Sequence, residues 1–368
     1  MFKVLQITGT LARGGLETFV MNVYRTVDRE KIQFDFLVHM ESGAYQQEVE
    51  SLGGSVYYVP SRHKGFIQFY KNMDAFFSVH AKEYCAVHMH VSTLSSIEAL
   101  YFAKKYGIKI RVIHSHSSSV KGNKLHYIFH YAMKSFVHDW ATHYLGCSEK
   151  AIKWLYQGTG IYDKVEMIKN GIEVEKFRYN ENVRNKVRKE LGIDNCFVLG
   201  HVGRFTWVKN HKFIIEIFRH IKGMIPNSKL VLVGEGILLT EIKQQVKLYG
   251  LEKDVLFTGV RSDINELLQG FDCFLMPSFY EGLPVSLVEA QCAGLKVFGS
   301  DAISLDTKIT PNMYFISLNE SAQRWAEIIT EHCGLIIRDN VVKLISEAGF
   351  DISQTTQILT KIYLSSNV

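Results

Sequence analysis

Residues 271–292 read FDCFLMPSFYEGLPVSLVEAQC, and this stretch decides the fold class. The apolar run at 271–276 predicts a buried strand. A helix is predicted over 284–292, because Pro284 suits a first helical turn and apolar residues follow it. A short buried strand joined to a helix by a brief loop is the repeating unit of a parallel sheet covered by helices.

The same alternation continues on both sides of this stretch. Polar residues fill 170–195, which we expect to connect two domains and to contain a short helix at 183–191. In the second domain we predict strands at 197–202, 229–233, 255–257, 271–276 and 296–298, and helices at 210–222, 239–249, 264–268 and 284–292. In the first domain we predict strands at 2–8, 34–39, 55–60, 86–91, 109–116, 143–148 and 165–168, and helices at 15–27, 45–52, 66–80, 97–106, 125–140 and 151–156.

These patterns predict an α/β protein with two doubly wound, Rossmann-like parallel-sheet domains that face each other across a cleft. We expect an N-terminal domain over residues 1–175 and a C-terminal domain over residues 176–345. A C-terminal helix within 346–368 is expected to pack back on the N-terminal domain. Ligands of open α/β sheets bind beyond the carboxyl ends of the strands, so functional residues are expected in those loops.

Composition narrows the class of protein. With 368 residues, 47% hydrophobic and 21% charged, the chain is long enough for two globular domains and is neither disordered nor collagen-like. Its six cysteines form no C-x-x-C pair, which argues against a disulfide framework or a zinc ribbon and favours a reducing cytoplasm. No apolar run approaches 18 residues, and the N-terminus lacks a signal-peptide cleavage site.

Positive charge is concentrated in the first half. Residues 1–170 carry 20 lysines and arginines against 14 aspartates and glutamates, whereas the formal net charge of the whole chain is +5. This excess is too small to indicate nucleic-acid binding, but it favours an anionic ligand or membrane surface on the N-terminal half. Aromatic stripes at 66–80 and 125–140 suit a membrane surface or a core facing the sheet, and we expect about half of them to be core.

In the second domain, two loops after predicted strands carry residues suited to a phosphorylated ligand. Arg204 and Lys209 follow strand 197–202, where their charges suit a diphosphate, although a solvated basic turn would show the same pattern. Gly282 and Leu283 precede the helix at 284–292, whose free N-terminal amides form a natural phosphate site. Glu289 lies on an otherwise apolar helix, where either a ribose diol or a salt bridge would satisfy its carboxylate.

In the first domain, the loop after strand 2–8 contains Gly14 and Gly15 and opens a helix, so it is either an anion site or an ordinary glycine-rich turn. His114 and His116 end the strand at 109–116, where they can hydrogen-bond or carry protons near neutral pH. A second pair, His88 and His90, has the same i, i+2 spacing. Because no third ligand with convincing spacing is evident, we rank metal binding below hydrogen bonding.

In combination, these motifs resemble the retaining glycosyltransferases of family 4, which have the GT-B fold. The resemblance rests on PSFYEGLPVSLVEA at 277–290, GRFTWVKN at 203–210, GTLARGGLET at 9–18 and NGIE at 170–173, and it spans about residues 2–330. The run His-Ser-His-Ser at 114–117 is similar to that of the capsular and exopolysaccharide branch. Gly294-Leu295-Lys296 lacks the proline common in the family, and Trp207 and Asn210 also depart from it, so the donor sugar stays open.

The resemblance implies roles for the second-domain residues. Arg204 and Lys209 would bind the donor diphosphate, and Glu289 would hold the ribose hydroxyls. Glu281, with the amides of Gly282 and Leu283, would contact the donor sugar and its phosphate.

For the first domain, the resemblance implies that Gly14 and Gly15 approach the pyrophosphate. His114 or His116 would lie near the 6-hydroxyl of the sugar and the reaction centre, with a slight preference for His116.

The resemblance also implies a function. It predicts an enzyme of the glycosyltransferase class that moves a sugar from a nucleotide sugar, UDP being the commonest carrier in the family, to a lipid-linked saccharide in bacterial capsular or exopolysaccharide biosynthesis. No cofactor or metal ion is implied, because placed cations and amides can stabilise the leaving diphosphate. A cytoplasmic location is expected, with peripheral contact to the anionic inner face of the plasma membrane. The alternatives are a non-catalytic nucleotide-sugar-binding protein and a GT-B epimerase.

Overall fold

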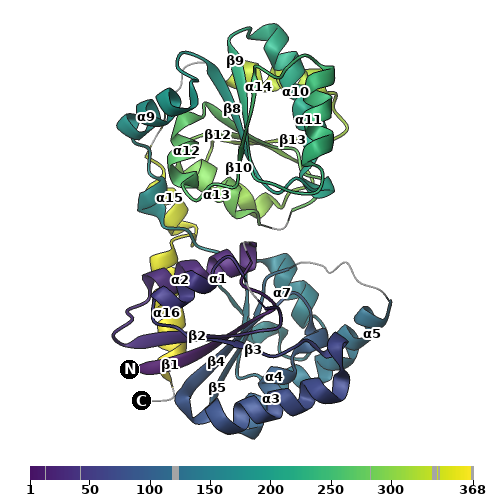
Figure 1. Ribbon diagram of the computed structural model, residues 1–368, viewed down its shortest axis with the longest axis vertical. Helices are drawn as coiled ribbons and strands as arrows, with labels where there is room; N and C mark the ends of the chain where they lie inside the picture. The colour runs from purple at the N-terminus through teal and green to yellow at the C-terminus, as the bar shows by residue number, and fades with distance from the viewer. Residues whose placement is uncertain are drawn as a thin grey trace. The chain divides into compact units, whose positions relative to one another are not determined.

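The computed structural model describes residues 1–12, 14–41, 43–117, 124–281, 283–333, 338 and 340–365. The chain forms two compact units (Figure 1). Unit 1 comprises Met1–Gly171 and Asp351–Val368, and unit 2 comprises Ile172–Phe350. The two units therefore divide at Gly171 and at Phe350, whereas the sequence placed the boundaries after residues 175 and 345.

Unit 1 is built on a sheet of seven parallel strands in the order β3-β2-β1-β4-β5-β6-β7. The order reverses between β1 and β4, which makes this the topological switch point of the unit. The strands are β1 (Phe2–Thr8), β2 (Ile32–Val38), β3 (Val56–Tyr58), β4 (Tyr84–Val91), β5 (Ile110–Ser115), β6 (His143–Gly146) and β7 (Glu166–Met167). The helices are α1 (Gly15–Thr26), α2 (Gln46–Ser51), α3 (Phe66–His80), α4 (Glu98–Lys105), α5 (Lys124–Met133), α6 (Val137–Trp140), α7 (Glu149–Tyr156) and α16 (Ile352–Leu364).

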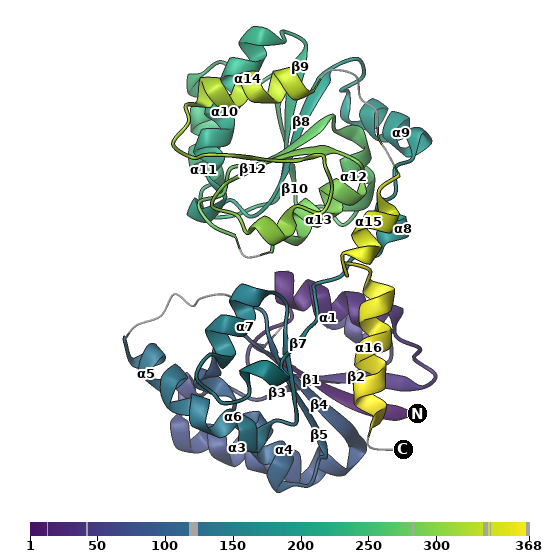
Figure 2. The same cartoon turned by 180° about the vertical axis from the view of Figure 1, so that it is seen from behind.

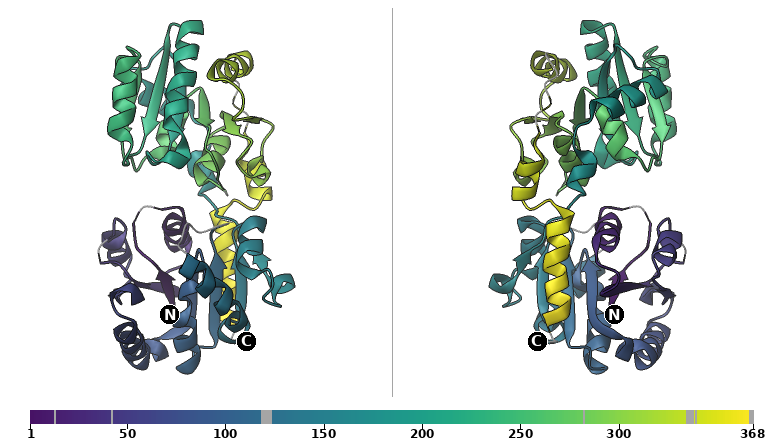
Figure 3. Two further views of the ribbon diagram at one scale, coloured as in Figure 1. Left: turned by 90° about the vertical axis from the view of Figure 1, so that its right-hand side faces the viewer. Right: turned by 90° about the vertical axis from the view of Figure 1, so that its left-hand side faces the viewer.

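Helices cover both faces of this sheet, so both faces are buried. Successive side chains of each strand point to opposite sides and enter two different cores. Leu5 packs into one core with residues of α3 and α4, whereas Val4 packs into a second core with residues of α1 and α16. The helix α16 runs along the sheet of unit 1 (Figures 2 and 3). Unit 1 thus contains a helix that the chain reaches only after it has passed through unit 2.

One predicted helix of unit 1 is interrupted. The segment expected as a single helix over 125–140 consists of α5, a 3₁₀ turn at Lys134–Phe136 and the short α6. At the turn, the ammonium of Lys134 donates to the carbonyl of Gln157 at 2.5 Å, a contact that the amphipathic pattern of the segment cannot reveal.

Unit 2 contains six parallel strands in the order β10-β9-β8-β11-β12-β13, with the switch point between β8 and β11. The strands are β8 (Phe197–Val202), β9 (Ser228–Val233), β10 (Val255–Gly259), β11 (Cys273–Met276), β12 (Lys296–Ser300) and β13 (Met313–Ile316). The helices are α8 (Val174–Phe177), α9 (Glu181–Leu191), α10 (His211–Met224), α11 (Leu239–Leu248), α12 (Ile264–Gly270), α13 (Val285–Cys292), α14 (Ala322–His332) and α15 (Val342–Glu347). The sequence missed β13, an edge strand of four residues of which only the first and last are buried.

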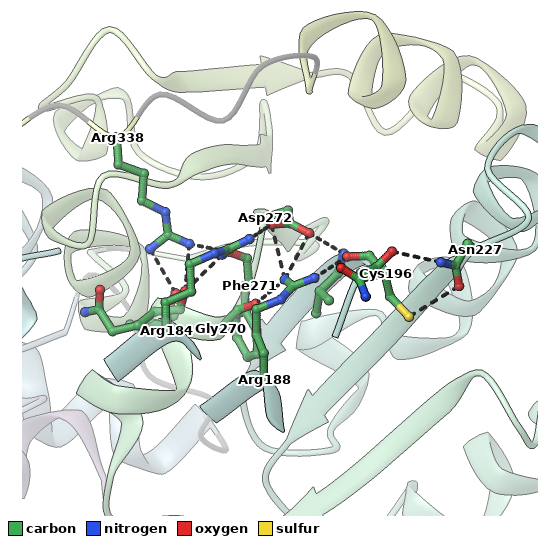
Figure 4. A network of polar contacts seen from close by, with 12 residues as sticks. Arg184, Arg188, Cys196, Asn227, Gly270, Phe271, Asp272 and Arg338 are labelled. Carbon is green, nitrogen blue, oxygen red and sulfur yellow. Dashed lines mark hydrogen bonds and ion pairs between the residues drawn. The ribbon is translucent and has the colours of Figure 1, made fainter. Parts of the chain in front are cut away.

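A buried polar network holds α9 against the amino end of β11 (Figure 4). Asp272 accepts hydrogen bonds from the guanidinium groups of Arg184 and Arg188 and, at 2.7 Å, from the backbone N–H of Val198. Arg338 donates to the backbone carbonyls of Gln269 and Phe271 nearby. Since the network lies at the amino ends of the strands, away from the end where α/β sheets bind ligands, its role is structural.

Candidate functional site

The loops after β8 and β11 flank the switch point of unit 2. The loop after β8 contains Arg204 and Lys209, and the loop after β11 leads through Glu281 into α13. Because β8 and β11 are neighbouring strands, their carboxyl ends bring these loops to one edge of the sheet. This edge is therefore the expected position for a ligand.

Direct contacts join the two loops. The backbone N–H of Phe279 donates to the carbonyl of Val208 at 2.9 Å, and the Asn210 side-chain amide donates to the carbonyl of Pro277 at 3.1 Å. The rings of Trp207 and Phe279 stack with their centroids 4.4 Å apart. Asn210 has a φ of +55°, a left-handed conformation that asparagine tolerates better than most residues. The loop residues are thus fixed relative to one another.

Lys209 and Glu281 form the charged centre of this edge. Their Nζ and Oε1 atoms are 2.8 Å apart, and both side chains are largely buried. The Lys209 ammonium also lies 3.9 Å from the sulfur of Met276. The Arg204 side chain is exposed on the same loop. This edge accordingly offers the fixed ammonium of Lys209 and the exposed guanidinium of Arg204 to an anionic ligand.

Glu289 lies on α13, immediately after these loops. Burial raises the pKa of its carboxyl to about 7, because desolvation disfavours the charged form. Among the residues that the structure describes, no side chain forms a salt bridge with Glu289, and none donates a hydrogen bond to its carboxylate. The Glu289 side chain is only partly exposed, and two ligand hydroxyls would supply hydrogen-bond donors to its carboxylate.

The other predicted residues of this edge are partly described. Leu283 is half-buried just before α13, whose N-cap is Pro284. Gly282 lies outside the described residues. Opposite the ligand-facing side, Gln291 is fully buried and fixes α13, because its side-chain oxygen accepts from the N–H groups of Ile309 and Thr310 at 3.1 and 3.0 Å.

In unit 1, the loop with Gly14 and Gly15 follows β1 at the switch point. Gly14 is the N-cap of α1 and has an extended backbone with φ of −131°. A Cβ atom at Gly14 would lie 2.3 Å from a carboxylate oxygen of Glu17, so a larger residue would displace that side chain. A Cβ atom at Gly15 would meet nothing within 4 Å, which leaves open space beside the helix N-terminus.

The four strand histidines of unit 1 form one cluster next to this loop. His88 and His90 on β4 lie beside His114 on β5 and His116 just after it, because His90 pairs with His114 in the sheet register. Ring centroids are 4.0 Å apart for His88 and His90, and 4.1 Å apart for His114 and His116. Phe19 of α1 packs its ring 5.3 Å from His114 and 5.2 Å from His116.

Burial lowers the pKa of all four imidazoles. Desolvation lowers the pKa of His116 to about 3. The pKa values of His88, His90 and His114 fall well below 6.5, because desolvation and neighbouring imidazoles disfavour the charged form. The cluster is therefore neutral at pH 7.

The sequence offered no third metal ligand for either histidine pair, and this interpretation was wrong. Ring nitrogens of His88, His90 and His114 lie within 4.8 Å of one another. However, both nitrogens of His90 are engaged in hydrogen bonds, 2.9 Å from Gln6 and 2.9 Å from His116. Hydrogen bonding thus accounts for His90 in this arrangement.

The structure also distinguishes the two candidate catalytic histidines. His114 has no exposed surface, whereas His116 follows the last residue of β5 and is partly exposed. Sequence reasoning missed Gln6 and Tyr363, which contact the cluster. Gln6 had a signal, since it is a lone polar residue in the buried strand β1, but Tyr363 lies on an ordinary amphipathic helix.

This fold and these loops define the class of protein. Residues 13–176 match the protein family described as "Glycosyltransferase Family 4", and residues 183–332 match the family described as "Glycosyl transferases group 1". The chain belongs to this family of glycosyltransferases and has the GT-B fold. A glycosyltransferase of Bacillus subtilis (strain 168) named EpsF is 35% identical over 98% of this chain and 96% of its own length.

Further relatives of this chain have names that refer to polysaccharide biosynthesis or to sugar transfer. The capsular polysaccharide biosynthesis glycosyltransferase CapH of Staphylococcus aureus is 27% identical over the whole of both chains. An Escherichia coli UDP-Gal:alpha-D-GlcNAc-diphosphoundecaprenol alpha-1,3-galactosyltransferase is 37% identical over 36% of this chain and 35% of its own length. The crystal structure of Anabaena HepE in complex with UDP has the same fold, with a TM-score of 0.79, 20% identity and full coverage of both chains. The protein is therefore a glycosyltransferase involved in polysaccharide biosynthesis.

The helices were also compared with the length of a membrane span. None of them, in the part of the chain that the structure describes, is both long and apolar enough to cross a bilayer.

Proposed function

We propose that the protein is a retaining glycosyltransferase that moves a sugar from a UDP-sugar to a lipid-linked saccharide. The observation that carries this proposal is the half-buried Glu289 carboxyl, to which no side chain of the described residues donates, next to the Lys209–Glu281 pair at the switch point of unit 2. A nucleoside diphosphate sugar suits both features. Its ribose diol can donate to the Glu289 carboxylate, and its anionic diphosphate can bind the Lys209 ammonium.

Cleavage of a glycosyl–phosphate bond places negative charge on the leaving diphosphate. Lys209 and Arg204 offset that charge, and the backbone amide of Leu283, just before α13, adds to the stabilisation. Glu281 orients Lys209 at 2.8 Å and contacts the donor sugar. Because these groups are preorganised, the reaction needs no cofactor and no metal ion.

The acceptor hydroxyl attacks the face that the diphosphate leaves, and the departing phosphate takes its proton. No protein nucleophile is required for this step. We assign the 6-hydroxyl of the sugar to His116, the more exposed of the two candidate histidines, and the diphosphate to Gly14 and Gly15. The anomeric configuration of the sugar is retained.

The choice of substrates follows from the relatives. HepE binds UDP, and the Escherichia coli relative uses UDP-galactose and a sugar linked to diphosphoundecaprenol. A thermal-shift panel of UDP-, GDP- and ADP-sugars tests the donor, and stabilisation by a GDP- or ADP-sugar alone would exclude a UDP-sugar. NMR of the anomeric proton of the product tests retention.

Two variants test the donor site. Glu289→Gln keeps the shape but leaves a neutral amide for the ribose, and Lys209→Ala removes the fixed cation, so each should lower turnover by about tenfold or more. Lys212→Ala is the matched control, because its ammonium pairs with Glu241 on α11 at 2.6 Å. Turnover equal to wild type in both site variants would disprove the donor site.

A lipid-linked acceptor requires contact with a membrane, and unit 1 has a suitable surface. Phe66 and Ile67 at the start of α3 are 58% and 71% exposed, and Lys64 is exposed beside them. The Arg62 guanidinium lies 5.0 Å from the ring centroid of Phe129, which joins this end of α3 to α5. In α3, Phe69, Met73, Phe76 and Phe77 are buried instead, so part of its aromatic stripe is core.

We propose that this surface binds the anionic inner leaflet from the cytoplasmic side. Exposed aromatic and aliphatic side chains next to basic residues are typical of such interfacial contacts. Flotation with phosphatidylglycerol vesicles should recover the wild-type protein but about tenfold less of Ile67→Asp. Val79→Asp, at the other end of α3 and 70% exposed, is the matched control. Absence of binding by the wild type at low salt would exclude the membrane contact.

A further inference from the structure

A continuous chain of hydrogen bonds crosses the apolar core of unit 1 and ends at His116. It begins at Tyr363 on α16, passes through Gln6 on β1 and His90 on β4, and reaches His116 after β5. Tyr363 and Gln6 are both 1% exposed, and the surrounding core is otherwise hydrophobic. Polar groups are costly to bury, so a linked set of them in a sheet core needs a reason.

The chemistry of the amide fixes the first proton. The Gln6 Oε1 atom lies 2.9 Å from His90 Nε2, and a carbonyl oxygen can only accept, so His90 carries its proton on Nε2. A neutral imidazole has one N–H, which leaves a lone pair on His90 Nδ1.

The second proton follows from the first. His90 Nδ1 lies 2.9 Å from His116 Nε2, so His116 must donate there and carries its own proton on Nε2. Its Nδ1 atom then carries a lone pair and is buried, with no partner closer than the hydrogen-bond limit among the described residues. The side chain of Asn170 lies beside His116 and interacts favourably with the charged imidazole, which raises the pKa of His116 against the effect of burial.

Tyr363 sets the direction of the chain. Its hydroxyl accepts from the Gln6 amide N–H at 3.5 Å and lies 2.6 Å from His88 Nδ1. This contact keeps the amide nitrogen of Gln6 toward Tyr363 and its oxygen toward His90. A helix from the far end of the sequence thus fixes the orientation of a side chain on the first strand.

We infer that Gln6, His90 and Tyr363 are positioning residues that hold His116 as the neutral Nε2–H tautomer with Nδ1 as a hydrogen-bond acceptor. In this state the lone pair of His116 Nδ1 can accept a hydroxyl of the bound sugar or acceptor. The inference rests on the proposed function only for this use of His116. The hydrogen-bond chain itself belongs to the unliganded protein.

The tautomers can be read directly in the full-length, unliganded protein. Long-range ¹H–¹⁵N spectra of ¹⁵N-histidine-labelled protein distinguish Nε2–H from Nδ1–H imidazoles, and the signals of His90 and His116 are assigned by their loss in His90→Gln and His116→Gln. We expect both histidines as Nε2–H tautomers, unchanged between pH 6 and 8. An Nδ1–H tautomer for His116 would overturn the inference.

Gln6→Leu tests the origin of the chain, since leucine fills the space without an amide. It should shift the signals of His90 and His116 toward mixed tautomers and lower kcat by about tenfold or more with little change in the KM for the donor. Gln33→Leu is the matched control, because Gln33 is a buried glutamine of the neighbouring strand β2 that bonds Tyr24 instead. Unchanged tautomers in Gln6→Leu, or an equal shift in Gln33→Leu, would refute the chain.

Tyr363→Phe removes one hydroxyl and should give a smaller shift of the same signals. A second measurement tests the catalytic position of His116 separately from the hydrogen-bond chain. If His116→Ala turns over as fast as wild type while the tautomers are as expected, the catalytic position of His116 fails and the hydrogen-bond chain stands.

Discussion

Acid should unfold unit 1 through its histidine cluster. An unfolded histidine titrates near pH 6.5, whereas the pKa of His116 in the folded protein is about 3 and those of His88, His90 and His114 are also well below the ordinary value. Below pH 6.5 the unfolded state therefore binds protons that the folded state does not. The contribution of the cluster to stability is complete above about pH 7 and is lost as the pH falls.

The size of the effect follows from these pKa values. With a folded pKa of about 3, His116 alone lowers the free energy of unfolding by about 2 kcal/mol between pH 7 and pH 5. The other three histidines act in the same direction, because their pKa values are also lowered. A typical domain has a stability of only about 5–15 kcal/mol, so unit 1 should be markedly less stable at pH 5 than at pH 7.

The variant His114→Leu tests this reasoning, because His114 is fully buried and its ring forms no hydrogen bond with a side chain of the described residues. Leucine removes one titrating group, so the variant should lose less stability than wild type between pH 7 and pH 5. His63→Gln, at an exposed position, is the control. Urea unfolding followed by hydrogen exchange of β4 and β5 peptides measures the difference. The same loss in His114→Leu and wild type would refute the argument.

Three further outcomes are expected. Turnover should persist in EDTA, because the site stabilises the leaving diphosphate with fixed cations and amides, and a strict need for a divalent ion would contradict the proposed mechanism. Gln291→Leu should destabilise unit 2 by about 3 kcal/mol or more, because it leaves the N–H groups of Ile309 and Thr310 without their acceptor. Calorimetry of this variant measures the loss of stability. Asp272→Ala should cost about 3–5 kcal/mol, because it leaves the guanidinium of Arg184 uncompensated in the network at β11, and a melting temperature equal to wild type would show that the network contributes nothing.

Much of the fold could be predicted because it depends on local patterns. Strand 2–8 coincides with β1, helix 66–80 coincides with α3 and strand 197–202 coincides with β8, since hydrophobic periodicity marks each of them. The edge strand β13 could not be found this way, because its middle residues are half-exposed and it has only four residues. The break in the helix predicted at 125–140 depends on a tertiary contact of Lys134.

The candidate site shows the same division. Lys209 was predicted from its loop and Glu281 from the family resemblance. Their ion pair depends on β8 and β11 being neighbours, which the chain order alone does not say. The histidine pairs were visible as i, i+2 motifs. Their convergence depends on the register between His90 and His114, which only the sheet determines. Long-range pairing was thus what the sequence could not supply.

The path of the chain has a consequence for biosynthesis. Unit 1 is complete only when α16 has docked, and α16 is made after all of residues 172–350. Unit 2 is continuous in sequence and can fold on the ribosome while one face of the first sheet is still open to water. When α16 docks, it also brings Tyr363 to Gln6, so unit 1 should complete its folding last. A nascent chain released before residue 352 should expose the uncovered face of the sheet of unit 1 to chaperones and proteases.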